Sequence, residues 1–383
     1  MHPALEAAQR LAPTIEAAGD EIERGRQLTP AVVDALVRER MFRLLLPKTL
    51  GGWELDLPTY VRVLEAIGRA DASTGWCLSQ CGGLCFLAAH LCDEGRVDVW
   101  GDPRAVVANG QGPDNRAVRV PGGYRVTGRW GFSSGCHHAT WLSGIAPVIE
   151  DGEPRRRADG SIELRSMLFP VEQAEILDVW HVGGLRGTGS DAFAVTDLFV
   201  PEHHSVSVAD DPVREPNPLY RFSQTLVFAN GFGMVALGLA QATVDCLVEL
   251  AGGKRPRGWT NLMRDHAVVQ MQLGQAAAHV RAGRALLRET VEEVWDAVCR
   301  RGEPTLDERV RMRLAGTHAL REAERAVDVV YTAAGATAIY QSHPLQRRFQ
   351  DMHTITQHVQ ARLGHYESVG RHLLGLEPDP LWL

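Results

Sequence analysis

The spacing of apolar residues changes twice along this chain of 383 residues, and the order of these changes limits the folds it can form. Residues 1–102 follow the helical period of about 3.6 residues, residues 103–212 alternate between apolar and polar, and residues 213–383 return to the helical period. We therefore predict an α+β protein with these three domains: an N-terminal helical domain, a small β-barrel or sandwich, and a C-terminal four-helix bundle.

Local signals support the first two zones. Thr29, Asp56 and Asp71 each precede an apolar run, and their side-chain oxygens suit the first, otherwise unpaired N–H groups of a helix. In the second zone, RAVRVPGGYRVTGRW (116–130) places a Gly-Gly pair between two alternating runs, which predicts a β-hairpin.

The last zone breaks near residues 252–258, 301–305 and 343–344, which leaves about four long helices. In the last helix four residues recur every seven positions: Asp351, His358, His365 and His372. We expect them to form one stripe on that helix. Histidine suits proton transfer near neutral pH, and a solvated polar stripe is the alternative interpretation.

Charge and hydropathy exclude several classes of function. With 47 acidic and 40 basic residues the net charge is −7, which argues against binding to nucleic acid or to an anionic membrane surface. No run of about 18 apolar residues predicts a membrane span, and the N-terminus lacks a signal-peptide layout. We infer a soluble cytoplasmic protein.

The seven cysteines do not predict a disulfide scaffold in a chain of this length. Cys77, Cys81 and Cys85 would share one helix face, and their spacing is not that of a zinc ribbon or a redox pair. We expect them to be small buried apolar residues, with no metal site.

The stretch GRWGFSSGCHHATW (128–141) has three possible interpretations: a nucleophile with its base, a metal site, or the wall of a cofactor pocket. A serine hydrolase is disfavoured because the G-x-S-x-G elbow is absent and no acid lies nearby to orient a base. His137 and His138 would point to opposite faces of a strand and lack a third ligand. We expect both to be surface or structural histidines.

Two other stretches have a composition that is common in phosphate-binding loops. VGGLRGTGSDAF (182–193) is neither a P-loop nor a Rossmann fingerprint, so hydride from NAD(P)H is not expected to enter through this chain; a tight bend between strands is the alternative. GGKRPRGW (252–259) contains Arg255 and Arg257, which suit a phosphate or an ordinary solvated loop equally well.

Four stretches carry a resemblance to a known family: ADASTGW (70–76), GGYRVTGRWGFSSGCHHATW (122–141), WHVGGLRGTGSDAFAVTDLFVP (180–201) and RRFQDMHTITQHVQ (347–360). With the order helical, β, helical, they resemble the acyl-CoA dehydrogenase superfamily over nearly the whole chain. Within it, the chain is most similar to the flavin-dependent monooxygenase branch. These are oxygenase components of two-component systems, such as p-hydroxyphenylacetate hydroxylase, aromatic polyketide hydroxylases and dibenzothiophene monooxygenase.

The resemblance implies a set of flavin-contacting residues. Phe132 would stack on the flavin ring and Ser134 would bond near its N5, and strand alternation would place both on one face. Arg255 and Arg257 would reach the flavin phosphate from a neighbouring subunit. The other cofactor-binding residues that it implies are Trp130, Asn109, Arg186, Thr188, Ser190 and Gly335.

The resemblance also separates two activities. A dehydrogenase needs a carboxylate base, but the matching positions are Val359 and the acid-free segment 225–233. In the monooxygenases a histidine follows the matching aspartate by seven residues, and that histidine is His358 here. The implied catalytic residues are therefore His358 and Ser134, and the implied substrate-binding residues are His358, Trp76 and Leu84.

We therefore expect an oxygenase that uses reduced flavin and O2, through a C4a-hydroperoxide, to hydroxylate a small aromatic or natural-product substrate. FMNH2 is favoured over FADH2 because Ala334-Gly335 only half matches the Gly-Gly pair that meets adenine in dehydrogenases. The expected partners are a separate NAD(P)H-flavin reductase, by diffusible flavin, and further copies in a homotetramer. The alternatives are a dehydrogenase-like desaturase or oxidase, and a non-catalytic flavin-binding homologue.

Overall fold

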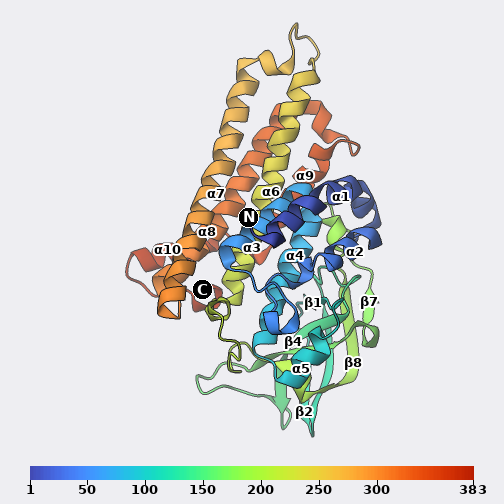
Figure 1. Ribbon diagram of the computed structural model, residues 1–383, viewed down its shortest axis with the longest axis vertical. Coiled ribbons are helices and arrows are strands. Elements are labelled where there is room, and N and C mark those ends of the chain that lie inside the picture. Colours follow the sequence, from blue (N-terminus) through green and yellow to red (C-terminus); the bar gives the residue numbers. More distant parts are fainter.

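The computed structural model describes residues 1–383, and a β domain lies at one end of a long helical bundle (Figure 1). The helices are α1 (Pro3–Gly25), α2 (Pro30–Arg38), α3 (Leu57–Ala70), α4 (Ala72–Leu84), α5 (Asp93–Trp100), α6 (Gln224–Gly253), α7 (Ala267–Arg301), α8 (Leu306–Ala334), α9 (Pro344–Thr356) and α10 (Gly364–Leu373). The strands are β1 (Val107–Gly110), β2 (Arg116–Val120), β3 (Gly123–Trp130), β4 (Trp141–Glu150), β5 (Glu153–Pro154), β6 (Leu164–Pro170), β7 (Glu175–Leu177), β8 (Ala192–Pro201) and β9 (Ser205–Val206). The predicted α+β class and the order of helical, β and helical regions are confirmed.

The predicted start signals are confirmed as helix caps. Thr29, Asp56 and Asp71 each accept a hydrogen bond from the backbone N–H three residues further on. These caps satisfy N–H groups that have no partner within their own helix, so each helix begins where its sequence predicts.

The sheet has the order β7-β8-β3-β2-β4-β6-β9, and β1 and β5 also pair with β4. The predicted hairpin joins β2 to β3, with Val120 opposite Gly123. Trp130, at the end of β3, fills the core of this domain. Glycines make room for its indole: a Cβ at Gly128 or Gly144 would lie 2.6 or 2.7 Å from a ring atom.

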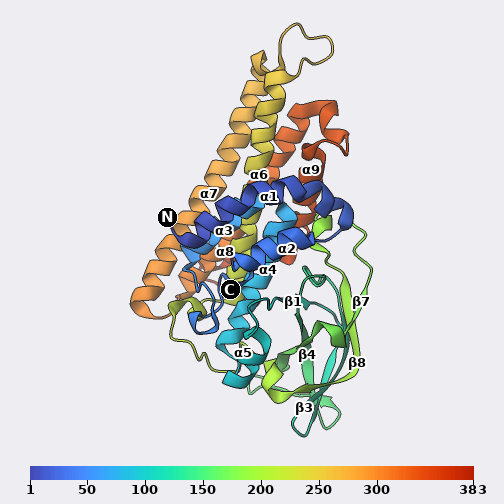
Figure 2. The same ribbon diagram turned by 45° about the vertical axis from the view of Figure 1, so that its right-hand side comes forward.

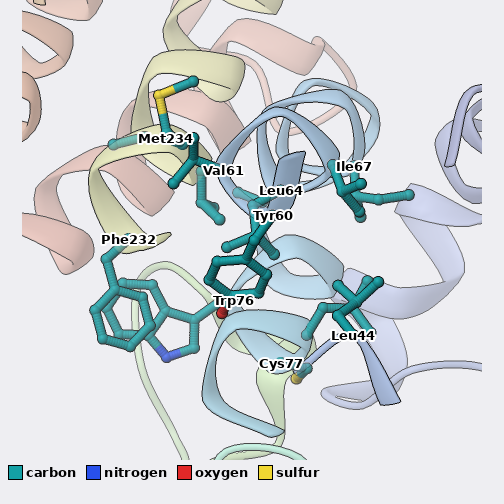
Figure 3. Close-up of a cluster of buried hydrophobic side chains, with 14 of the residues drawn as sticks. Leu44, Tyr60, Val61, Leu64, Ile67, Trp76, Cys77, Phe232 and Met234 are labelled. Carbon is teal, nitrogen blue, oxygen red and sulfur yellow. The ribbon is translucent and has the colours of Figure 1, made fainter. Parts of the chain in front are cut away.

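The N-terminal helices and the bundle share one core, whereas the sheet has its own. A single cluster of 79 buried residues runs through α1 to α4 and α6 to α8, and a second cluster of 15 lies within the sheet. Figure 3 shows Tyr60 and Leu64 of α3 and Trp76 of α4 in this core with Phe232 and Met234 of α6. In Figure 2, α1 crosses the bundle in front of these elements. The boundaries after residues 102 and 212 stay a prediction.

Helix α6 is the central helix of the bundle. By length and composition alone it could cross a membrane, but 67% of its most apolar window is buried inside the protein. Its apolar residues therefore serve the core that it shares with α3, α4 and α8.

The predicted stripe of Asp351, His358, His365 and His372 on one helix is wrong. Helix α9 ends at Thr356, and His358 has extended backbone (φ −68°, ψ 147°) at the start of a short 3-10 helix, Val359–Ala361. His365 and His372 lie on α10. The His358 side chain caps the new turn by accepting the Gln360 N–H, and such local bonds compete with continuation of a helix.

Candidate functional site

Trp76 is the centre of the candidate site. Its indole stacks on Phe232 of α6 at 3.9 Å between ring centroids and 15° between planes, as Figure 3 shows. The His358 ring meets Trp76 edge-on at 5.0 Å and Phe232 at 4.9 Å. Three residues that lie far apart in sequence therefore form one aromatic group, which holds each ring in a fixed orientation.

A chain of hydroxyl groups begins at the same indole. Trp76 Nε1 donates to Ser134 Oγ at 3.2 Å, and Ser134 Oγ lies 2.7 Å from Ser190 Oγ. Ser190 Oγ lies 2.6 Å from Thr188 Oγ1, which donates to the Leu185 carbonyl at 2.8 Å. The structure thus brings together Trp76, Ser134, Thr188 and Ser190, four residues that the sequence singled out.

The glycine-rich stretch is a bend between β7 and β8, and α9 holds it from outside the β domain. Leu185, which has φ +50°, donates its N–H to the buried Asp351 carboxyl at 2.6 Å. Burial raises the pKa of Asp351 to about 8, so this carboxyl is mostly protonated at neutral pH. The Trp180 indole N–H donates to the Leu185 carbonyl at 3.0 Å.

His358 is neutral at physiological pH. Desolvation by its apolar surroundings lowers the pKa of its imidazole to about 4. Its Nδ1 accepts the Gln360 N–H at 3.3 Å, which assigns the imidazole proton to Nε2. His358 therefore offers an N–H donor rather than a free basic nitrogen on its other side.

The predicted placement of Phe132 and Ser134 on one strand face is wrong. Strand β3 ends at Trp130, and Phe132 has φ +57°, so the strand alternation does not reach these residues. Phe132 is 70% exposed, whereas Ser134 is 4% exposed. The exposed Phe132 ring lies edge-on to the half-buried Trp180 at 6.1 Å, beside the bend.

The prediction that Trp130 binds the cofactor disagrees with its position in the structure. Its side chain is fully buried, stacks on Phe193 at 5.2 Å, and donates from Nε1 to the Ile145 carbonyl at 2.9 Å. A ring enclosed in this way has no surface for a cofactor, so Trp130 supports the fold. Leu84 is likewise a buried core residue at the end of α4.

Two other predicted cofactor residues lie at partly exposed positions. Asn109 lies on β1 opposite Ser143 of β4, whose buried Oγ has no hydrogen-bond partner. Arg186 begins the 3-10 helix of the bend, and its Nε lies 3.5 Å from Glu23 of α1. The buried Arg186 Nε makes no hydrogen bond and faces Glu23, but the side chain is 38% exposed, so its terminal N–H groups can reach a ligand.

The two adjacent histidines have different environments. His137 Nε2 lies 2.7 Å from Asp191, so the expectation that no acid lies nearby is wrong; the acid comes from the bend. The His138 Nε2 is buried without a partner, and burial lowers the pKa of His138 to about 4. Neither serine of the stretch bonds to a histidine: Ser133 Oγ is unpartnered and Ser134 bonds to Trp76 and Ser190. A serine–histidine nucleophile is therefore absent.

Arg255, Arg257 and Gly335 lie at the opposite end of the bundle from the β domain. The loop after α6 is at the top of Figure 1, and Lys254 at its start donates to the Ala334 carbonyl at 2.6 Å. Both arginines are exposed. Within one chain these residues are remote from Ser134, so only another copy could bring them to it.

Sequence reasoning missed Phe232, Trp180 and Asp191. Phe232 lies in the acid-free segment 225–233, and the apolar helical pattern of that segment is the signal that favours a buried aromatic residue there. Trp180 and Asp191 lie within the marker stretch 180–201. Nothing local to Asp191 indicates that it pairs with His137.

The site suits a flat heteroaromatic cofactor beside a small substrate. The exposed Phe132 ring beside the half-buried Trp180 offers an aromatic surface, the partly exposed Arg186 offers terminal N–H donors, and Ser134 has an unused lone pair. The His358 N–H and the Trp76 and Phe232 rings offer a polar group within an apolar wall. This combination is typical of pockets for small organic molecules.

Comparison with known proteins agrees with this description. Residues 6–94 match the acyl-CoA dehydrogenase N-terminal domain, and residues 230–362 match the acyl-CoA dehydrogenase C-terminal domain. An indole-3-acetate monooxygenase of Pseudomonas putida is 31% identical over 95% of this chain and 91% of its own length. The flavin-dependent monooxygenase oxygenase subunit HsaA of Rhodococcus jostii is 30% identical over 90% of each chain.

A solved structure gives the same result in three dimensions. XiaF from Streptomyces, in complex with FADH2 and glycerol, has a TM-score of 0.88 and 29% identity, over 98% of this chain and 96% of XiaF. The similarity thus includes both helical regions and the β domain.

Proposed function

The chain belongs to the acyl-CoA dehydrogenase family, in its branch of flavin-dependent monooxygenases, and we propose that it hydroxylates a small aromatic compound with reduced flavin and O2. One observation carries this proposal: the indole of Trp76 packs against His358 in a T-shaped contact and donates to Ser134 from Nε1. A donor for the substrate and a hydroxyl for the cofactor are thereby held by one side chain. The relatives named above are monooxygenases, and one acts on an indole derivative.

We propose that Phe132, with Trp180, lies against the flavin ring and that Ser134 accepts a hydrogen bond from it. Arg186, Asn109, Thr188 and Ser190 complete the cofactor side from the sheet and the bend. When bound, the reduced flavin supplies the electrons and holds the oxygen that is transferred. The protein's part is to orient the ring and to exclude water, which the burial of Ser134, Thr188 and Ser190 favours.

His358 then serves as a hydrogen-bond donor to the substrate or to the departing oxygen. Its lowered pKa and the bond at Nδ1 support this role over that of a base, because the neutral ring already carries its proton on Nε2. Trp76 and Phe232 provide the apolar wall that receives the substrate ring.

The desaturase alternative is not favoured. Removal of an α-proton needs a carboxylate, and neither Val359 nor the segment 225–233 supplies one. Asp351, the nearest acid in sequence to His358, is buried and bonded to the Leu185 N–H.

We further propose FMN as the flavin, a separate reductase as its source, a cytoplasmic location, and a homotetramer in which Arg255 and Arg257 of one copy bind the flavin phosphate of another. The remote position of both arginines supports donation between copies. The term oxygenase subunit in the name of HsaA supports a separate reductase. Because XiaF holds FADH2, titration with both reduced flavins is needed to decide the form.

The test is stopped-flow mixing of oxygenated buffer with the protein and reduced FMN or FAD under anaerobic conditions. We expect a near-ultraviolet absorbance band that outlives the reoxidation of free flavin, and incorporation of one oxygen atom into an added indole or phenol. Reoxidation as fast as in buffer, with no product from any aromatic compound, would contradict the proposal.

A further inference from the structure

The hydroxyl chain from Trp76 to Leu185 has only one possible direction. A carbonyl oxygen can only accept a hydrogen bond, so the Thr188 hydroxyl must donate its hydrogen to the Leu185 carbonyl. Ser190 must then donate to Thr188, and Ser134 must donate to Ser190. At the other end the indole N–H can only donate, which agrees with Ser134 as its acceptor.

This direction leaves Ser134 as an acceptor toward the rest of the site. Its single hydrogen points to Ser190, and one of its two lone pairs receives the Trp76 N–H. The only hydrogen-bonding capacity that remains is the second lone pair. Ser134 can therefore bind a donor beside it but has no hydrogen to offer an acceptor.

The surroundings keep this arrangement fixed. All three hydroxyl residues are buried: Ser134 is 4% exposed, Ser190 3% and Thr188 1%. Bulk water therefore does not replace a hydrogen-bond partner that one of them loses. The Leu185 carbonyl that ends the chain belongs to a residue whose N–H is bound by Asp351. Reversing the chain would break the buried hydrogen bond from Thr188 to the Leu185 carbonyl, and with no acceptor beside Ser134 it would also leave the Ser134 hydrogen without a partner.

We infer that Ser190 and Thr188 are positioning residues that make Ser134 an obligate acceptor, and that the site thereby prefers reduced over oxidised flavin. This inference rests on the proposed function, in which Ser134 faces N5 of the ring. Reduced flavin carries a hydrogen on N5, whereas oxidised flavin has a lone pair there. Only the reduced form offers the donor that Ser134 requires; the oxidised form would set two lone pairs against each other.

The experiment measures dissociation constants for oxidised and reduced FMN, the latter under anaerobic conditions, by quenching of tryptophan fluorescence. We expect the wild type to bind the reduced form at least about tenfold more tightly, the ratio for one unmade buried hydrogen bond. Ser190→Ala frees the Ser134 hydrogen to turn toward N5. It should tighten binding of oxidised FMN and reduce the ratio to about threefold or less, with little change for reduced FMN.

Two further variants complete the test, and a third serves as its control. Ser190→Thr keeps a hydroxyl and should restore the wild-type ratio. Thr188→Val should reduce the ratio in the same direction as Ser190→Ala but less, because Ser190 loses its fixed acceptor. The control is Ser133→Ala, since the Ser133 hydroxyl is equally buried but has no hydrogen-bond partner; its ratio should equal that of the wild type.

The outcomes separate this inference from the proposed function. If the wild type binds neither flavin, the proposed function fails and this inference fails with it. If the wild type binds reduced FMN but Ser190→Ala and Thr188→Val keep the ratio of Ser133→Ala, only the orienting role of the chain is overturned. A folded Thr188→Val protein decides the question should Ser190→Ala prove unstable.

Discussion

Asp351 on α9 accepts the backbone N–H of Leu185 at 2.6 Å, and this bond ties the bundle to the bend of the β domain. The two residues are 166 positions apart in the sequence. The bend carries Thr188 and Ser190, so the position of the hydroxyl chain depends on a carboxyl outside the β domain. Burial raises the pKa of that carboxyl to about 8, which makes the bond sensitive to pH.

Asp351→Asn should remove one source of pH dependence from stability. The carboxyl has a pKa near 3.9 when unfolded and about 8 when folded, so the unfolded state alone ionises between these values. The stabilisation of the wild type by the neutral carboxyl is complete below pH 4 and is lost as pH rises to 8, by at most about 1.4 kcal/mol per pH unit. Urea unfolding at several pH values should show a flatter profile for Asp351→Asn, whose amide oxygen still accepts the Leu185 N–H.

The control for this experiment is Asp114→Asn, in an exposed loop of the β domain. It should leave the pH profile of the wild type unchanged. A profile for Asp351→Asn that is as steep as that of Asp114→Asn between pH 4 and 8 would show that Asp351 ionises as readily in the folded state as in the unfolded one.

A pair of neighbouring glycines tests the contact between α9 and the bend. A Cβ at Gly184 would lie 2.1 Å from the Gln350 backbone oxygen, whereas a Cβ at Gly183 meets only the Gln350 side-chain oxygen at 3.3 Å. We expect Gly184→Ala to lower the free energy of unfolding by about 2–3 kcal/mol, and Gly183→Ala by less than about 1 kcal/mol. Thermal unfolding of both variants measures the difference; equal midpoints would contradict the close approach.

Sequence patterns predicted the parts of the fold that are determined locally. The caps at Thr29, Asp56 and Asp71 and the hairpin between β2 and β3 depend on neighbours in sequence, so the pattern contains the whole cause. The stripe on the last helix failed because a period of seven does not reveal where a helix ends. A capping side chain at His358 decided that, and a histidine cap carries little sequence signal.

The sequence predicted part of the group of residues that the structure brings together, but not its geometry. The resemblance identified Ser134, Ser190, Thr188, Trp76 and His358, and the structure brings these residues together. The direction of the hydroxyl chain depends on contacts across more than 50 residues, which no local pattern encodes. The positive φ of Phe132 likewise ends the alternation of the strand, although the sequence pattern predicts that the strand continues to Ser134.

Phe132→Ala should weaken flavin binding without weakening the fold. The ring is 70% exposed and lies 6.1 Å from the Trp180 ring, so its loss should change the free energy of unfolding by less than about 0.5 kcal/mol. Loss of the stacking surface should raise the dissociation constant of reduced flavin about tenfold. Fluorescence titration and urea unfolding measure the two effects. A large loss of stability with normal flavin binding would show that Phe132 has a structural role instead.

Arg255 and Arg257 should act on the site of another copy. We expect the double variant Arg255→Ala, Arg257→Ala to bind reduced flavin at least about tenfold more weakly, because a charge-assisted phosphate contact is lost. Co-expression with Phe132→Ala, under separate tags, should yield mixed oligomers in which some sites contain both intact parts. Partial recovery of flavin binding in the mixed species is the expected result; no recovery would indicate that each copy binds flavin alone.

His358 should be needed for hydroxylation but not for flavin binding. His358→Ala removes the Nε2–H donor, and loss of such help lowers turnover by about 10²-fold or more, while the dissociation constant of reduced flavin stays near that of the wild type. His358→Asn keeps an N–H donor and should retain more activity. The matched control is His353→Ala, since the one hydrogen bond of the His353 side chain goes to Asp328, at 2.9 Å and away from the site.

The pH dependence tests the same residue in another way. Because burial lowers the pKa of His358 to about 4, its neutral form is the functional one and hydroxylation should not decline as pH falls through 6.5. The stability that the neutral ring provides is likewise present above pH 6.5 and is lost as pH falls toward 4. Single-turnover hydroxylation between pH 5 and 8 should therefore be flat on its acidic side. An acidic decline centred near 6.5 that disappears in His358→Asn would show an exposed, ordinary histidine, and would contradict the packing of His358 against Trp76 from which its role as a donor is argued.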